Sequence, residues 1–223
     1  MSVVLGTLIL NEMQWLPKLY EQHKRWPELA KWVFVEAADR VYADTNPELV
    51  TSDGRSVDGT SEFLVELARK DSRVEYVQHG FTTNTDPAQG KCAARNRYLD
   101  AAENVKPEFL IVVDADEFYT HHDQEKILLL MKRTMKTALV FKHRDIRRPP
   151  SIVDQPLFQY EVRGGFWDIP YCRCWRWQTG LRYESNHNTP EIRGRGLDLR
   201  LRRYDRVHRA PECIHFGFAS HAN

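Results

Sequence analysis

Apolar and polar positions along the first 140 residues predict strands that alternate with helices. Residues 2–10, SVVLGTLIL, form a nearly continuous apolar run, which is typical of a buried strand. Residues 13–26 then place apolar side chains near helical spacing. Further strands are predicted at 31–39, 73–78 and 109–114, and further helices at 61–70, 93–104 and 125–135. This order predicts an α/β fold with a mainly parallel central sheet flanked by helices.

The stretch 42–61, YADTNPELVTSDGRSVDGTS, interrupts this alternation and is rich in turn-forming residues. It therefore predicts a loop, with Ser61 at its end as the N-cap of the following helix. In the second half of the chain, short strands are expected around the WRW sequence at 175–177 and around Cys213 and Ile214.

Composition narrows the class of protein. The chain has 223 residues, of which 42% are hydrophobic and 28% charged, as in ordinary globular proteins, and one domain is expected. No apolar run approaches the roughly 18 to 20 residues that span a bilayer, and the N-terminus lacks the basic start of a signal peptide. We therefore expect no transmembrane segment and a cytoplasmic protein.

The four cysteines, at 92, 172, 174 and 213, are expected to be reduced thiols. Cys172, Cys174, Cys213 and His215 form a conceivable zinc set. The CRC spacing does not match the usual C-x2-4-C pattern, which favours packed thiols over zinc.

Charge is unevenly distributed along the chain. Residues 1–140 contain 17 Lys and Arg against 22 Asp and Glu, a net charge of −5, whereas residues 141–223 contain 15 against 9, a net charge of +6. Two basic runs, at 142–148 and 193–209, carry most of the positive charge. Either run alone is as well explained by a solvated surface, but together they favour a negatively charged substrate.

Acidic residues follow directly after three predicted strands. The clearest case is LIVVDADEFY at 110–119, where four apolar residues precede Asp114, Asp116 and Glu117. Carboxylates this close repel one another unless a cation neutralises them, and a divalent metal is the natural candidate. Asn11 and Glu12 follow the first strand, and Glu36 and Asp39 end the second.

Ligands of parallel sheets bind at the carboxyl ends of the strands, so these side chains are expected to share one edge. The glycine-rich phosphate-binding motifs G-x-G-x-x-G and G-x4-G-K-[ST] are absent from the sequence. Metal and arginines would therefore have to hold the phosphates of a bound nucleotide.

A family resemblance rests on five short motifs in a fixed order. They are NE at 11–12, an acid at 36, DGT at 58–60, ARN at 94–96 and VVDADE at 112–117. This series resembles the GT-A fold glycosyltransferases of family 2. The DADE wording, followed by CRCWRWQTGLRYESNHNTP at 172–190, is similar to bacterial lipopolysaccharide-core glucosyltransferases. One departure is the long stretch between the acid at 36 and DGT.

The resemblance implies transfer of a sugar from a nucleoside diphosphate donor such as a UDP-sugar, helped by Mn²⁺ or Mg²⁺. A hard cation held by carboxylates would stabilise the negative charge of the leaving diphosphate. The resemblance implies that Asp116 binds the metal, that Glu36 accepts a hydrogen bond from the base with Asp39 as its substitute, and that Arg95 meets phosphate or base. The full set of implied donor-binding residues is Thr7, Asn11, Glu12, Glu36, Asp39, Arg95, Asp114 and Ala115.

Two further roles are needed beyond the sheet. A third metal ligand is expected from a histidine, and His215 is preferred to His187 because it follows a short predicted strand. The expected enzyme is a hexosyl- or pentosyltransferase. If it inverts the anomeric centre, a general base must take the proton of the acceptor. The candidates are Asp168, Glu184 and His187.

The sequence is compatible with two kinds of polyanionic acceptor. A basic half with several Trp and Tyr residues suits a lipopolysaccharide core or another glycan, and equally a modified DNA base. The two halves are expected to be a nucleotide-sugar half at 1–120 and an acceptor half at 121–223 of a single domain. Two other classes compete: a basic nucleic-acid-binding module without catalysis, and another metal-dependent nucleotide-using transferase.

Overall fold

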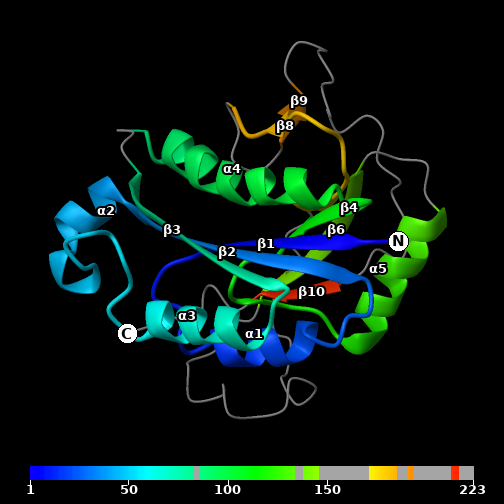
Figure 1. Ribbon diagram of the computed structural model, residues 1–223, viewed down its shortest axis with the longest axis horizontal. Coiled ribbons are helices and arrows are strands. Elements are labelled where there is room, and N and C mark those ends of the chain that lie inside the picture. Colours follow the sequence, from blue (N-terminus) through cyan, green and yellow to red (C-terminus); the bar gives the residue numbers. More distant parts are fainter. Residues whose placement is uncertain (83–85, 134–137, 146–170, 185–189, 193–211, 216–223) are drawn as a thin grey trace.

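The computed structural model of the chain describes residues 1–82, 86–133, 138–145, 171–184, 190–192 and 212–215 (Figure 1). The helices are α1 (Leu16–His23), α2 (Arg40–Thr45), the 3₁₀ turn η1 (Pro47–Leu49), α3 (Thr60–Lys70), α4 (Pro87–Val105) and α5 (His121–Arg133). The strands are β1 (Val3–Ile9), β2 (Leu29–Asp39), β3 (Val74–Thr82), β4 (Phe109–Val112), β5 (Glu117–Phe118), β6 (Ala138–Asp145), β7 (Tyr171–Arg176), β8 (Leu181–Arg182), β9 (Glu191–Ile192) and β10 (Glu212–His215).

One large sheet organises these strands, in the order β3-β2-β1-β4-β7-β6-β10-β5. The first four strands in this order run parallel to one another. Strand β7 is antiparallel to both β4 and β6, whereas β10 is parallel to β6 and antiparallel to β5. The predicted α/β fold with a mainly parallel central sheet is confirmed. Because β1 lies between β2 and β4, the segments that follow these strands meet at one edge.

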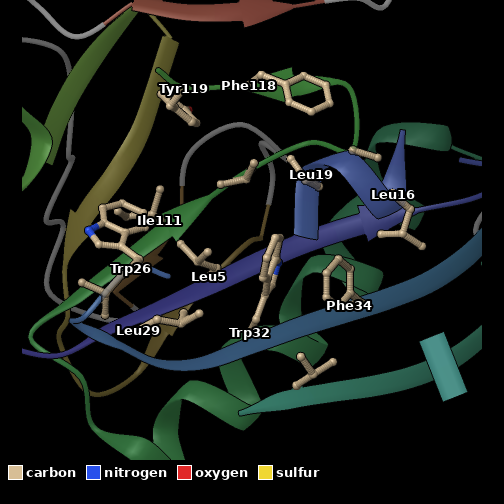
Figure 2. Close-up of a cluster of buried hydrophobic side chains, with 14 of the residues drawn as sticks. Leu5, Leu16, Leu19, Trp26, Leu29, Trp32, Phe34, Ile111, Phe118 and Tyr119 are labelled. Carbon is tan, nitrogen blue, oxygen red and sulfur yellow. The ribbon is translucent and has the colours of Figure 1, made fainter. Parts of the chain in front are cut away.

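Helices cover both faces of the sheet (Figure 1). Helix α4 packs on one face, where Tyr98 and Leu99 meet Val33 and Leu110. Helices α1, α3 and α5 cover the other face. Figure 2 shows the centre of this second core, where Trp32 stacks on Phe34 with 4.7 Å between the ring centroids. These two apolar layers explain why β1 and β4 are apolar at nearly every position.

The stretch predicted as a loop contains two helical segments, α2 and η1. The Asp39 carboxylate accepts the Tyr42 N–H at 3.0 Å and so caps α2, which explains why a helix forms among turn-forming residues. The N-cap of α3 is Gly59, so the prediction of Ser61 as the cap is wrong. Ser61 lies in the first turn of the helix, where its hydroxyl binds Glu36 instead of a backbone N–H.

Candidate active site

Asn11 marks the point where the chain leaves β1. Its φ of 54° lies in the left-handed region, which Asn tolerates better than most residues. Its N–H donates to Ser56 Oγ at 2.9 Å, its Nδ2 donates to the Leu49 carbonyl at 2.6 Å, and its Oδ1 accepts the Val57 N–H at 2.9 Å. Asn11 therefore holds the segment between η1 and α3 against the end of β1.

The NE and DGT motifs, nearly fifty residues apart in sequence, are joined by hydrogen bonds. The Glu12 N–H donates to Thr60 Oγ1 at 3.0 Å, and the Met13 N–H donates to Asp58 Oδ2 at 2.9 Å. The other oxygen of Asp58 accepts the Thr60 N–H at 3.0 Å. The structure thus brings together two of the motifs on which the family resemblance rests.

The pKa of Glu12 reflects the burial and the negative charge at this edge of the sheet. Burial, together with the negative charges of Asp116, Asp58 and Asp114, raises the pKa of its carboxyl from 4.5 to about 8. These acids follow β1 and β4 and precede α3, so three separate segments contribute to one negative region. A cation in this region would favour the charged form of Glu12.

Glu36 is fully buried, and the chain's own donors surround its carboxylate. Oε1 accepts the Ser56 N–H at 2.9 Å, the Ser61 hydroxyl lies 2.8 and 2.9 Å from the two oxygens, and the Tyr76 hydroxyl donates to Oε2. Three donor groups of the chain thus bind this carboxylate, which offers about four lone-pair positions. Glu36 therefore anchors the loop before α3, and the base contact that the resemblance implies for it stays a prediction.

Two other predicted donor-binding residues have local structural partners. Thr7 has no exposed surface, and its hydroxyl accepts the Trp32 indole N–H at 2.9 Å within the core. Thr7 is thus a buried hydrogen-bond acceptor in this structure, and the donor-binding role implied for it stays a prediction. Asp39 is more exposed than Glu36 and caps α2 through Tyr42, as described above.

The acid-rich turn after β4 is held by an arginine that the sequence analysis did not single out. Arg173, in β7, places Nη2 2.6 Å from Asp114 Oδ2 and also donates to Glu117 Oε1. Glu117 Oε2 in turn accepts the Asp114 N–H at 3.0 Å. Burial raises the pKa of the Glu117 carboxyl to about 7, although the positive charge of Arg173 acts in the opposite direction. Arg173 thus supplies at least part of the positive charge that these acids require.

Arg95 approaches the same turn from α4. It is 5% exposed, and its Nη2 lies 3.5 Å from Asp114 Oδ1, on the other side of the carboxylate from Arg173. Its guanidinium carbon lies 5.8 Å from the centroid of the Tyr183 ring. Within the described part of the chain, Nε and Nη1 of Arg95 have no hydrogen-bond partner. These buried N–H groups are available to an anion.

The backbone of His215 lies beside the acid-rich turn. In the ladder between β10 and β5 its backbone pairs with Glu117, the residue next to Asp116. Ala115, between the two aspartates, is 3% exposed. The position of the backbone is compatible with a metal ligand at His215, which stays a prediction.

The three candidates for the general base are located less completely. Glu184 is exposed and follows Tyr183, whose backbone N–H and carbonyl bind the Asn96 side chain on α4 at 2.8 and 2.9 Å. Asp168 and His187 lie outside the described residues. Their predicted roles therefore stay predictions.

The donor chemistry of this edge fits a hard divalent cation. Carboxylate oxygens are the ligands that Mg²⁺ and related ions prefer, and Asp116, Asp58 and Asp114 all add negative charge around the buried Glu12. Over the described ranges, however, no three His, Cys, Asp or Glu side chains are arranged so that they could hold a metal ion. The described residues therefore suit a divalent cation by their chemistry and charge, but they do not form a complete set of ligands for it.

Comparisons with known proteins place these motifs in a wider context. The model of a protein family described as Glycosyl transferase family 2 matches residues 23–186. The search of curated proteins found no match.

None of the helices in the described ranges has the length and apolar character needed to cross a membrane.

Solved structures of S. aureus TarS match with low similarity. TarS 1–349 gives a TM-score of 0.45 and 17% sequence identity, covering 66% of this chain and 36% of that chain. Its complexes with UDP and with UDP-GlcNAc give TM-scores of 0.44 and 0.45 at the same identity and the same coverage of this chain, and cover 36% and 35% of those chains. The chain thus spans little more than a third of the TarS 1–349 fragment.

Proposed function

Because the chain belongs to glycosyl transferase family 2 and has the mixed α/β architecture of the GT-A fold, we propose that its carboxyl-edge acids serve a metal-dependent sugar transfer. The donor would be a nucleoside diphosphate sugar, with UDP as the first nucleotide to test. The reaction would be a hexosyl or pentosyl transfer that inverts the anomeric centre.

One observation carries this proposal. Acids from three segments converge at one edge of the sheet: the Met13 N–H, next to Glu12, binds Asp58, and Asp114 lies between Arg95 and Arg173. Burial and the charges of Asp116, Asp58 and Asp114 accordingly raise the pKa of Glu12. Surface acids spread for solubility would not converge in this way, because their mutual repulsion costs stability. A site that binds a divalent cation together with a diphosphate makes use of this convergence.

Asp116 would hold the cation together with His215, and Asp114 would lie beside it. When bound, the cation would supply Lewis-acid stabilisation of the negative charge that develops on the leaving diphosphate. The chain's own contribution is positional: Glu12 and Met13 tie the DGT motif to the end of β1, and Arg95 would offer buried N–H donors to a phosphate oxygen.

Proton transfer needs a group near the acceptor hydroxyl. Glu184 is the candidate within the described residues, and it is exposed, as a group that meets an incoming acceptor must be. Asp168 and His187 remain the alternatives. The acceptor itself would be a polyanion, either a phosphorylated glycan or a modified DNA base, because residues 141–223 carry a net charge of +6.

The two parts of the chain would divide these tasks within one domain. Residues 1–120 supply the acids and the DGT motif, and we assign donor binding to them. Residues 121–223 contain the basic runs, and we assign acceptor binding to them. Strand β7 of the second part pairs with β4 of the first, so both parts contribute to one sheet.

A donor screen tests the proposal. The full chain is incubated with a panel of nucleotide sugars and Mn²⁺, and release of free nucleoside diphosphate is measured. We expect one nucleotide to dominate and Asp116→Asn to lower the rate by about a hundredfold or more. Asp100→Asn, an exposed aspartate on α4, is the matched control and should keep the wild-type rate. Absence of hydrolysis from every donor, or an unaffected D116N variant, would refute the proposal.

A further inference from the structure

Arg173 reaches the acid-rich turn from a distant part of the sequence. It lies on β7, which runs antiparallel to β4 with Cys174 opposite Ile111. The next residue of β7 in the direction of the turn is Arg173, whose side chain is 8% exposed. An arginine is rarely buried this completely unless its charge is paired.

The guanidinium group of Arg173 contacts two acids of the turn at once. Nη2 lies 2.6 Å from Asp114 Oδ2 and also binds Glu117 Oε1. Glu117, in turn, accepts the backbone N–H of Asp114. Asp114 is thus fixed both at its backbone, through Glu117, and at its carboxylate, through Arg173.

We propose that Arg173 is a positioning residue of the donor site, which fixes the turn between Asp114 and Glu117 so that Asp116 can bind a divalent cation with its diphosphate. This inference rests on the proposed function and adds a residue to it. Arg173 itself would touch neither the donor nor the cation; it acts through the two acids that it binds.

Charge supplies the physical reason. Glu117 is fully buried, and Asp116 and Glu12 add further negative charge nearby. Without the Arg173 guanidinium between them, the carboxylates of Asp114 and Glu117 would repel each other and separate, and the turn between them would change shape. Lysine would keep the charge but not the planar group, so it should restore the positioning only in part.

Binding of Mn²⁺ to the full chain tests the proposal without measuring turnover. Isothermal titration calorimetry gives the affinity for Mn²⁺ at saturating UDP and the affinity for UDP alone. We expect Arg173→Met to weaken Mn²⁺ binding roughly 10- to 100-fold, as loss of a residue that orients a metal ligand does elsewhere. Arg173→Lys should lie between R173M and the wild type, and UDP binding without metal should change much less.

Arg176→Met is the matched control, because Arg176 belongs to the same strand and lies over the Phe109 ring, 4.6 Å from its centroid. It should bind Mn²⁺ as the wild type does. If R173M does not fold, the double variant Arg173→Met with Glu117→Gln removes both charges of the buried pair and is compared with Glu117→Gln alone.

The outcomes separate the two proposals. A folded R173M variant that binds Mn²⁺ with wild-type affinity would overturn the positioning role alone. A lower melting temperature with unchanged Mn²⁺ affinity would do the same, since it indicates only a structural role. A wild-type chain that binds no Mn²⁺ with UDP would contradict the proposed function and this inference together.

Discussion

Glu36 shows how a single buried charge can organise a loop. Ser56, Ser61 and Tyr76 supply donors to its carboxylate from the loop before α3, from α3 itself and from β3. Loss of such an acceptor leaves buried donors unpaired, which costs more than an average hydrogen bond contributes. The residue therefore links three elements at the edge where the acids converge.

Replacing this acid should destabilise the whole chain. We expect Glu36→Ala to lower the free energy of unfolding by about 2–4 kcal/mol, because three donors lose their acceptor and a cavity forms. Urea unfolding at pH 7 measures the effect. Glu75→Ala, which removes a half-exposed ion pair with Lys31 on the neighbouring strand, should cost less than about 1 kcal/mol. An E36A variant of wild-type stability with altered nucleotide preference would instead indicate a base-reading role.

His23 should make stability depend on pH. It is fully buried against Trp26, Trp32 and Tyr119, and burial lowers its pKa from 6.5 to about 4. Between these values the unfolded chain binds the proton more tightly than the folded chain, so this contribution is lost as pH falls. The loss from His23 between pH 7 and pH 5 should be about 2 kcal/mol.

His23→Met removes the titrating group, and its free energy of unfolding should fall correspondingly less between these two pH values. Urea unfolding at pH 7, 6 and 5 measures the difference. His121→Gln changes an exposed histidine and should retain the wild-type pH dependence. The same dependence in H23M as in the wild type would contradict this account.

At the scale of elements, the loop between η1 and α3 rests on an irregularity of β3. The pairing of β2 with β3 shifts between Glu36 and Ala37, where Gln78 and Gly80 are the partners, so His79 is the extra residue of a bulge. Gly54 packs on this bulge with a φ of 82°, and a Cβ there would lie 2.8 Å from Gly80 C and from Phe81 N. The loop can approach β3 this closely only because two glycines meet.

Gly54→Ala should therefore be more harmful than positive φ alone predicts. A left-handed alanine costs about 1 kcal/mol, and a clash with backbone atoms adds to it, so we expect a loss of roughly 3 kcal/mol or more. Gly180→Ala is the matched control, since Gly180 has a φ of 84° and open space around its Cβ position. Thermal or urea unfolding compares them, and equal losses would mean that the loop moves away from β3 at little cost.

Sequence patterns predicted the strands and helices correctly where the signal lay within a short stretch of the chain. The apolar run of β4 followed by Asp114 and Asp116 predicted both the strand and the acidic edge. Helix α2 was not predicted because residues 42–61 are rich in turn-forming residues; its cap, Asp39, lies before that stretch. Arg173 could not be located, because it meets Asp114 only through the pairing of β7 with β4.

At the scale of the whole molecule, charge separates along the chain while the sheet joins the parts. Residues 1–140 carry a net charge of −5 and residues 141–223 a net charge of +6, yet β4 and β7 are neighbours in one sheet. The negative edge suits a cation with a diphosphate, and the positive part suits a polyanionic acceptor. A transferase needs both within reach of each other.

Manganese located directly in a crystal tests the central claim. Crystals of the full chain soaked with Mn²⁺ and UDP are measured with X-rays near the manganese absorption edge, where anomalous differences identify the metal. The account predicts a manganese peak bonded to the Asp116 carboxylate and to the diphosphate, with Arg173 still bound to Asp114. Bound UDP with no manganese peak at Asp116 would contradict it.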